Sequence, residues 1–321
     1  MPFLNSRMVA ELATGMAATA LLIGCAGCAT EPAEAKNHLV RTVAAPDAAA
    51  AAIKGSSPNE LGPVPVLAYG RVTREPGRAD TIDSARLRSD LEWLATEGYT
   101  PVLARDYVDG RLDLPAGRHP VVLTFDARDP AELVGLGPTG TPEPGSTADT
   151  LLSVARLHPD FTPVATVFTP STPFTAAAGR SRRALRWLEQ HGFEVADGLG
   201  SERGTTGPGA PDTPNRRRAA ATAAHSAPAG PAETAARYRG VFLADGGLAP
   251  SPYCVEFDQR AIPRARLTPL PAGRGATAGL AQLTGQPSER YTSDGDASRL
   301  SFPRPAGRCL APAYRSLAAA Y

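Results

Sequence analysis

The sequence lacks a surplus of either charge and lacks an apolar run long enough to cross a bilayer. Lys and Arg together number 33 and Asp and Glu 32, so the net charge is +1. This balance indicates neither nucleic acid nor an anionic membrane surface as a partner. The apolar stretch from Met16 to Gly24 is too short for a transmembrane helix. Gly and Pro are abundant, 31 and 32 residues, which indicates many loops.

The short apolar stretch has the features of an export signal. Arg7 precedes it, and it ends in Leu22-Ile-Gly-Cys25, which resembles the lipobox of bacterial lipoproteins. The resemblance implies a signal peptide over residues 1–24 and lipid on the Cys25 thiol. The protein would then be anchored to the cell membrane on its extracytoplasmic side. An ordinary signal peptide or a buried helix are the alternatives, and Cys28 is a second, poorer lipidation site.

Only four cysteines are present, and two of them, Cys254 and Cys309, follow the tether region. In an exported chain they are candidates for a disulfide, and two unpaired buried thiols are the alternative. No Cys-x-x-Cys pair lies in the expected folded region. Cysteine-based zinc binding is therefore not indicated there.

The chain divides into a tether and one α/β domain. Residues 25–62 are rich in Ala, Pro, Glu and Ser and predict a flexible tether, and residues 63–321 follow as the domain. Within the domain a low-complexity insertion is expected at about 204–234. Alternating strand and helix patterns elsewhere predict a parallel α/β fold, best accommodated as an irregular (β/α) barrel. We expect strands at 64–69, 100–103, 121–125, 164–168 and 193–196, helices at 81–96, 149–157 and 182–190, and weaker strands at 238–243 and 261–267.

The strongest strand signal carries the main candidate residue. Val121 to Phe125 is a continuous apolar run and is followed by Asp126. In parallel sheets and barrels, reacting groups lie at the carboxyl ends of strands. Asp126 is therefore the candidate catalytic residue, although a strand-end Asp also commonly caps backbone amides.

Several segments, in order, resemble the polysaccharide deacetylase family (the NodB-homology domain). The similar segments are Val64–Val72, Leu91–Val102, Arg118–Asp129, His158–Phe168, Leu185–Val195, Ala249–Tyr253 and Arg290–Asp296. The resemblance implies a (β/α) barrel and hydrolysis of the amide bond of N-acetylated cell-wall glycans. In that family a divalent metal, such as zinc, polarises the carbonyl and supplies the nucleophilic water.

The resemblance fails at the residues that should hold the metal. The family has an Asp general base followed by a metal-binding Asp, and here Asp126 matches the base while Ala127 stands at the metal position. Gly198 and Glu202 stand where two metal-binding His residues are expected. The family's Arg-bearing third motif is expected within residues 204–234, where only low-complexity sequence is present. We therefore expect no metal cofactor.

Other residues offer a rebuilt site as an alternative. Asp126, Asp197, Glu202 and His225 are the candidates for it. His191 is expected to cap a helix end. The two histidines that precede prolines, His119 and His158, are expected in loops.

The sequence thus predicts a deacetylase-like envelope lipoprotein directed at cell-wall glycans, with hydrolysis impaired by the missing ligands. One alternative is an active carbohydrate deacetylase with a rebuilt metal site. The other is a structural or scaffolding lipoprotein without sugar affinity.

Overall fold

The fold is described from a computed structural model of the chain. The structure describes residues 57–74, 81–170, 178–198, 221–224, 240–243, 246–267, 280–282, 284 and 289–321. All of them belong to one compact unit, residues 44–321. The predicted signal peptide, Cys25 and Cys28 lie outside the described residues. None of the helices in the described ranges combines the length and the apolar character that a bilayer span requires.

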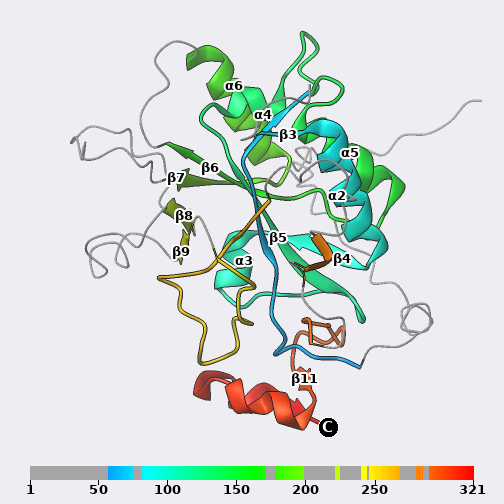
Figure 1. Ribbon diagram of the computed structural model, residues 1–321, viewed down its shortest axis with the longest axis vertical. Coiled ribbons are helices and arrows are strands. Elements are labelled where there is room, and N and C mark those ends of the chain that lie inside the picture. Colours follow the sequence, from blue (N-terminus) through cyan, green and yellow to red (C-terminus); the bar gives the residue numbers. More distant parts are fainter. Residues whose placement is uncertain are drawn as a thin grey trace, which may run out of the picture. The chain divides into compact units, whose positions relative to one another are not determined.

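The centre of the fold is one sheet of eight parallel strands (Figure 1). The strand order is β10-β1-β5-β6-β7-β8-β9, and β4 pairs with β5 as well. The strands are β1 (Val66–Tyr69), β4 (Tyr99–Val102), β5 (His119–Asp126), β6 (Thr166–Pro170), β7 (Glu194–Gly198), β8 (Ala221–Ala224), β9 (Gly240–Leu243) and β10 (Ala265–Leu267). The prediction of a parallel α/β fold is confirmed.

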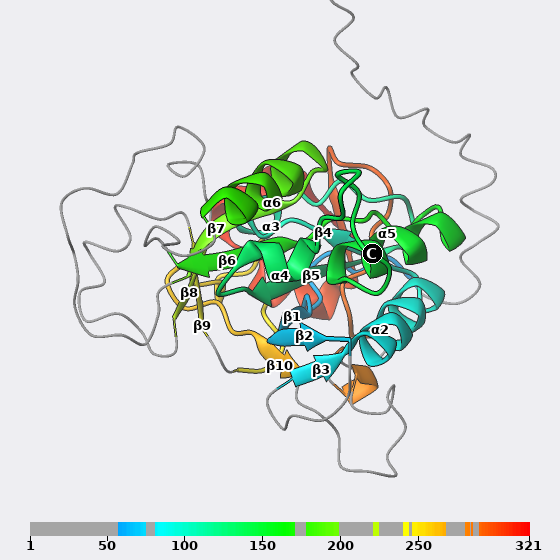
Figure 2. The same cartoon turned by 90° about the horizontal axis from the view of Figure 1, so that it is seen from above.

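Helices and two small sheets surround this sheet (Figures 1 and 2). The helices are α2 (Ser84–Thr96), α3 (Ala104–Val108), α4 (Pro130–Val134), α5 (Thr147–Leu157) and α6 (Ala178–Gln190). The small sheets pair β2 (Arg71–Thr73) with β3 (Thr81–Asp83) and β11 (Leu300–Phe302) with β12 (Ala318–Ala320). Two 3-10 helices, η2 (Arg304–Cys309) and η3 (Pro312–Leu317), lie between β11 and β12.

Side chains alternate along β5 between two apolar clusters, as a strand buried on both faces requires. Leu123 and Phe125 belong to the cluster that includes residues of α2, α5 and α6. Val122 belongs to the other cluster, with Phe168 of β6 and Phe242 of β9. By the same alternation, Asp126 lies on the Val122 side of β5.

One irregular segment links β9 to β10 and β1. Ile262 forms a parallel bridge with Phe242 of β9, and the chain then continues into β10, which pairs with β1. The amide of Val241 also donates to the carbonyl of Gln259 at 2.7 Å. The segment from Gln259 to Leu267 therefore contacts strands at both ends of the sheet order, β9 and β1.

Glycines end two helices at the expected positions. Gly98 follows α2 with φ +81°, and Gly192 follows α6 with φ +83°. These left-handed conformations suit glycine because it has no Cβ. The start of α2 is different from the prediction, since Thr81–Asp83 forms β3 and the Asp83 side chain caps the helix by accepting from the amide of Arg86 at 2.8 Å.

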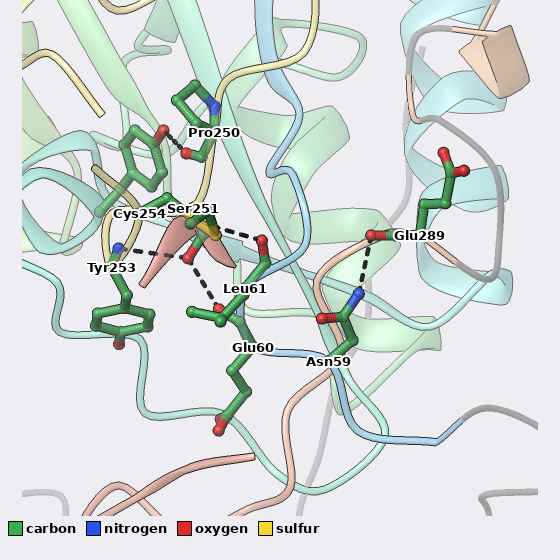
Figure 3. Close-up of a disulfide and its surroundings, with 10 residues drawn as sticks. Asn59, Glu60, Leu61, Pro250, Ser251, Tyr253, Cys254 and Glu289 are labelled. Atoms are coloured by element: carbon green, nitrogen blue, oxygen red, sulfur yellow. Dashed lines mark hydrogen bonds between the residues drawn. A yellow bond between two sulfur atoms is a disulfide. The ribbon is translucent and has the colours of Figure 1, made fainter. Parts of the chain in front are cut away.

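The predicted tether boundary at residue 62 is wrong. Asn59, Glu60 and Leu61 are buried, and Asn59 forms an antiparallel bridge with Thr292. The Ser251 hydroxyl donates to the carbonyl of Glu60 at 2.8 Å (Figure 3). The folded domain therefore begins before Asn59, because these contacts to distant segments order residues whose composition alone suggests flexibility.

The predicted insertion at 204–234 lies outside the described residues except for β8, a strand that the sequence analysis did not predict. The loop prediction for His119 is also wrong. His119 is the first residue of β5 and is buried, and burial lowers its pKa to about 4. Its Nδ1 lies 2.7 Å from the carbonyl oxygen of Tyr291, which holds the neutral ring in place.

Candidate functional site

Asp126 lies at the carboxyl end of β5 and is held by an arginine from a distant segment. The Asp126 carboxylate accepts from both terminal nitrogens of Arg264, at 2.8 Å from Nη1 to Oδ1 and 3.2 Å from Nη2 to Oδ2. The Arg264 side chain is 0% exposed and that of Asp126 is 29% exposed. Two parallel N–H···O bonds fix both the position and the plane of the carboxylate. The Asp126 side chain thus stays partly exposed although both of its oxygens accept from Arg264.

Arg264 is positioned by three further contacts. Its Nε donates to the carbonyl of Leu243 at 2.7 Å, and its Nη1 donates to the Thr124 hydroxyl at 3.2 Å. Its guanidinium carbon lies 5.1 Å from the centroid of the Phe168 ring, within the range of a cation–π contact. Strands β5, β6 and β9 therefore all contribute to holding this arginine against Asp126.

The residues present do not fit a metal at the positions that the deacetylase resemblance assigns to ligands. Ala127 offers no ligand atom and packs against the apolar cluster beneath the helices. Gly198 ends β7, and a Cβ added there would meet backbone atoms of Thr169 at 3.3–3.4 Å. Even a substituted ligand at 198 would therefore have to displace β6 slightly. Glu202 lies outside the described residues.

The other candidates for a rebuilt site are not brought to Asp126 within the described structure. Asp197 is next to Gly198 on β7, and Ala196 belongs to the same interior cluster as Phe168. Because strand side chains alternate, Asp197 lies on the opposite face from Ala196. His225 lies outside the described residues.

Two further histidines, His158 and His191, lie at the carboxyl ends of helices. His158 follows the last residue of α5 as its C-cap. His191 Nδ1 lies 2.7 Å from the carbonyl of Trp187, and the two rings stack at 3.9 Å. The expected helix-capping role of His191 is confirmed.

The structure joins Cys254 to Cys309 by a disulfide, which ties the loop after Pro250 to the end of η2. Glu256 lies near the two sulfurs, and together these three residues form a cluster with metal-ligand atom types. Both sulfurs are committed to the disulfide, so neither is a thiolate, the form in which Cys binds metal. This cluster is no substitute for the missing ligands beside Asp126.

Sequence reasoning missed Arg264 as the residue that contacts Asp126. It placed the family's arginine motif within residues 204–234, whereas the structure supplies Arg264, just before β10. A signal was present, because Arg264 interrupts an otherwise strand-like segment between Ile262 and Leu267. A buried arginine in such a segment requires an acidic partner, and Asp126 was the main candidate acid.

No protein-family model and no curated protein matches the chain. Similar solved structures include a polysaccharide deacetylase candidate of Bacillus anthracis, with a TM-score of 0.49, 15% identity and coverage of 69% of each chain. The Streptococcus pyogenes deacetylase PplD, in complex with acetate, has a TM-score of 0.46 and 15% identity over 71% of this chain and 99% of PplD. IcaB from Ammonifex degensii has a TM-score of 0.43 and 18% identity over 65% of this chain and 93% of IcaB. Similarity at this level does not transfer an activity.

Proposed function

We propose that this protein is a polysaccharide deacetylase-like envelope protein that binds N-acetylated cell-wall glycan at the carboxyl end of the sheet without hydrolysing it. One observation supports this most directly. Asp126 is kept and rigidly oriented by Arg264, while the neighbouring positions Ala127 and Gly198 carry no group that can ligate a metal. An oriented acceptor for a ligand is thus present, while neither of these two described positions offers a side-chain group for metal-assisted hydrolysis.

Amide hydrolysis requires a nucleophile and stabilisation of the tetrahedral oxyanion. In metal-dependent hydrolases the metal provides both functions. A carboxylate that acts as general base needs such a bound water to deprotonate. With Ala127 and Gly198 in the ligand positions, Asp126 has no described partner of this kind.

The Asp126 carboxylate is suited to binding a sugar. Each of its oxygens accepts one hydrogen bond from Arg264, and a carboxylate oxygen has a further lone pair for another donor. Amide N–H groups and hydroxyls of an N-acetylated sugar are such donors. Because the carboxylate is fixed in advance, little side-chain entropy is lost when a donor binds.

We expect the purified full chain to bind N-acetylglucosamine oligomers and to release no acetate from them. Asp126→Asn should weaken binding about fivefold, because an amide replaces a charged acceptor. Asp113→Asn, at an exposed position in the loop before β5, is the matched control and should change affinity less than about twofold. Calorimetric titration of each variant, after circular dichroism has established its folding, measures the effect.

Three outcomes contradict this proposal in different ways. Acetate release by the wild type that Asp126→Asn abolishes, together with one tightly bound zinc per chain, would establish the rebuilt-site alternative. Absence of oligomer binding by the folded wild type would favour a structural lipoprotein. Equal losses of affinity in the Asp126 and Asp113 variants would show that Asp126 is not part of the binding site.

We also propose that the chain is anchored to the membrane by lipid on Cys25. The support is Leu22-Ile-Gly-Cys25 after a short apolar stretch. In bacteria fed a clickable fatty acid, the wild-type protein should be labelled, and the Cys25→Ser, Cys28→Ser double variant should lose nearly all label. A Cys28→Ser single variant should remain labelled. Equal labelling of wild type and double variant would rule out lipidation at this site.

A further inference from the structure

A crevice of about 380 Å³ lies beside the segment that connects β9 to β10, which is drawn in yellow in Figure 1. Its lining is apolar, with three prolines and Phe257, except for two carboxylates, Glu256 and Asp258. Both acidic residues are exposed, and neither forms an ion pair with a described residue. From this lining we infer that the crevice is a binding site for a cationic sugar, a glycan unit that carries a free amine.

The crevice is separate from the Asp126 site. Of its lining residues, Pro63 comes three residues before β1 and Pro263 two residues before β10, so the crevice lies toward the amino ends of these paired strands. Asp126 is the last residue of β5, which runs parallel to β1, and it therefore lies toward the opposite, carboxyl end of the sheet. A ligand in the crevice is thus held by other residues than a ligand at Asp126.

Contacts between distant segments hold the walls of the crevice in place. An antiparallel bridge between Val64 and Ala249 joins the segment before β1 to the segment after β9. The Tyr107 hydroxyl of α3 donates to the carbonyl of Pro250 at 2.6 Å, and the rings of Tyr107 and Phe257 meet edge to face with their centroids 5.3 Å apart. Because the walls are fixed before a ligand binds, little conformational entropy is lost on binding.

The two carboxylates determine the sign of the ligand. Glu256 and Asp258 flank Phe257 in the chain, so a cation held by the carboxylates is also near the aromatic ring, which attracts ammonium groups. The Arg260 amide donates to Asp258 Oδ1 at 2.8 Å, which leaves Oδ2 without a described partner. An anionic sugar would be repelled by the same two carboxylates. The charge of the crevice therefore selects a cationic ligand.

The size and the apolar lining favour one or a few sugar rings over a folded partner. The volume of about 380 Å³ lies near the lower end of the range of roughly 300–1000 Å³ that is typical of small-molecule sites. The C–H groups of a sugar ring can pack on proline and phenylalanine while its amine faces the carboxylates. That the cation is carried by a glycan rests on the proposed function, and the acidic, apolar crevice itself does not.

Oligomers of glucosamine are the probe for this inference, and N-acetylglucosamine oligomers, whose nitrogen is uncharged, are the counterpart. At about pH 5.5 exposed carboxylates are ionised and the sugar amine is protonated. The purified full chain should bind glucosamine oligomers with an affinity that falls as salt is added. The Glu256→Gln, Asp258→Asn double variant should bind them about fivefold more weakly, because two exposed charge pairs are lost. Its affinity for N-acetylglucosamine oligomers should stay within about twofold of wild type.

Two further variants separate the crevice from a general effect of charge. The Glu97→Gln, Asp113→Asn double variant removes the same charge at exposed positions that do not line the crevice, and it should stay within about twofold of wild type. Phe257→Leu keeps an apolar side chain but removes the aromatic face, and it should weaken binding of glucosamine oligomers about threefold. Titration calorimetry measures these affinities, after circular dichroism has established that each variant is folded.

Equal losses in the two double variants would overturn the inference, because a general charge effect would explain them. Tighter binding of a lysine-rich peptide than of glucosamine oligomers would overturn it in favour of a cationic peptide as ligand. If N-acetylglucosamine oligomers bind and glucosamine oligomers bind the crevice variant as tightly as the wild type, only this inference fails. If glucosamine oligomers bind through the crevice and N-acetylglucosamine oligomers do not bind, only the proposed glycan site at Asp126 fails.

Discussion

Replacing Asp126 by Ala is expected to lower the free energy of unfolding by about 3–5 kcal/mol, because it leaves a buried charge without its partner. The Arg264 side chain is 0% exposed and donates two hydrogen bonds to Asp126. The carbonyl of Leu243 and the hydroxyl of Thr124 would still accept from the guanidinium, but neither carries a compensating charge. Urea unfolding followed by circular dichroism measures this difference.

A second substitution distinguishes loss of the charge partner from loss of packing. Asp126→Ala combined with Arg264→Met should be more stable than Asp126→Ala alone, since Met fills much of the space and removes the orphaned charge. Asp113→Ala, at an exposed position, should change stability by less than about 0.5 kcal/mol. A double variant less stable than Asp126→Ala would show that Arg264 contributes mainly through packing and its other hydrogen bonds.

Stability is expected to depend on pH through Glu60, a buried carboxyl group in the segment before β1. Burial, reinforced by the nearby charge of Asp294, raises the pKa of Glu60 from 4.5 to about 7. The amide of Ser301 donates to Oε2 at 2.7 Å and the Tyr291 hydroxyl donates to Oε1 at 3.3 Å, which partly offset this desolvation. The folded protein thus holds a proton on Glu60 that the unfolded chain releases at lower pH.

The sign of the effect follows from this difference in proton binding. Between about pH 4.5 and pH 7 the folded state binds more protons, so the Glu60 contribution to stability is complete below this window and is lost as the pH rises through it. The raised pKa corresponds to roughly 3 kcal/mol. His119 acts in the opposite direction, because burial lowers its pKa to about 4 and stability therefore falls as the pH drops below about 6.5.

The Glu60 effect is isolated by comparing Glu60→Gln with the wild type at each pH. The variant should match the wild type near pH 4.5 and exceed it by up to about 3 kcal/mol at pH 8, where the wild type carries a buried charge. Gln can accept from the Ser301 amide and donate to the Tyr291 oxygen. Glu97→Gln, at an exposed position, is the control and should change stability by less than about 0.5 kcal/mol. A stability difference for Glu60→Gln that does not grow with pH would contradict the prediction.

Local sequence patterns predicted most of the large elements of the fold. The apolar run at 121–125 lies within β5, and the leucine spacing at 81–96 lies largely within α2. These elements can be predicted from the sequence because burial on one or both faces imposes a periodicity on neighbouring residues. Short elements such as α3 and α4, with five residues each, were missed because they contain too few residues to show a period.

The residue types at positions 126, 127 and 198 already limit which side-chain atoms the site can offer. Asp126 follows a buried strand, and Ala127 and Gly198 have no ligand atoms whatever the fold does with them. Two features depend on tertiary packing: Arg264, 138 residues from Asp126 in the chain, binds the Asp126 carboxylate, and Glu60 is buried. The reason is that periodicity reports contacts within one element, whereas ion pairs and the burial of single charges depend on packing between segments that no local pattern relates.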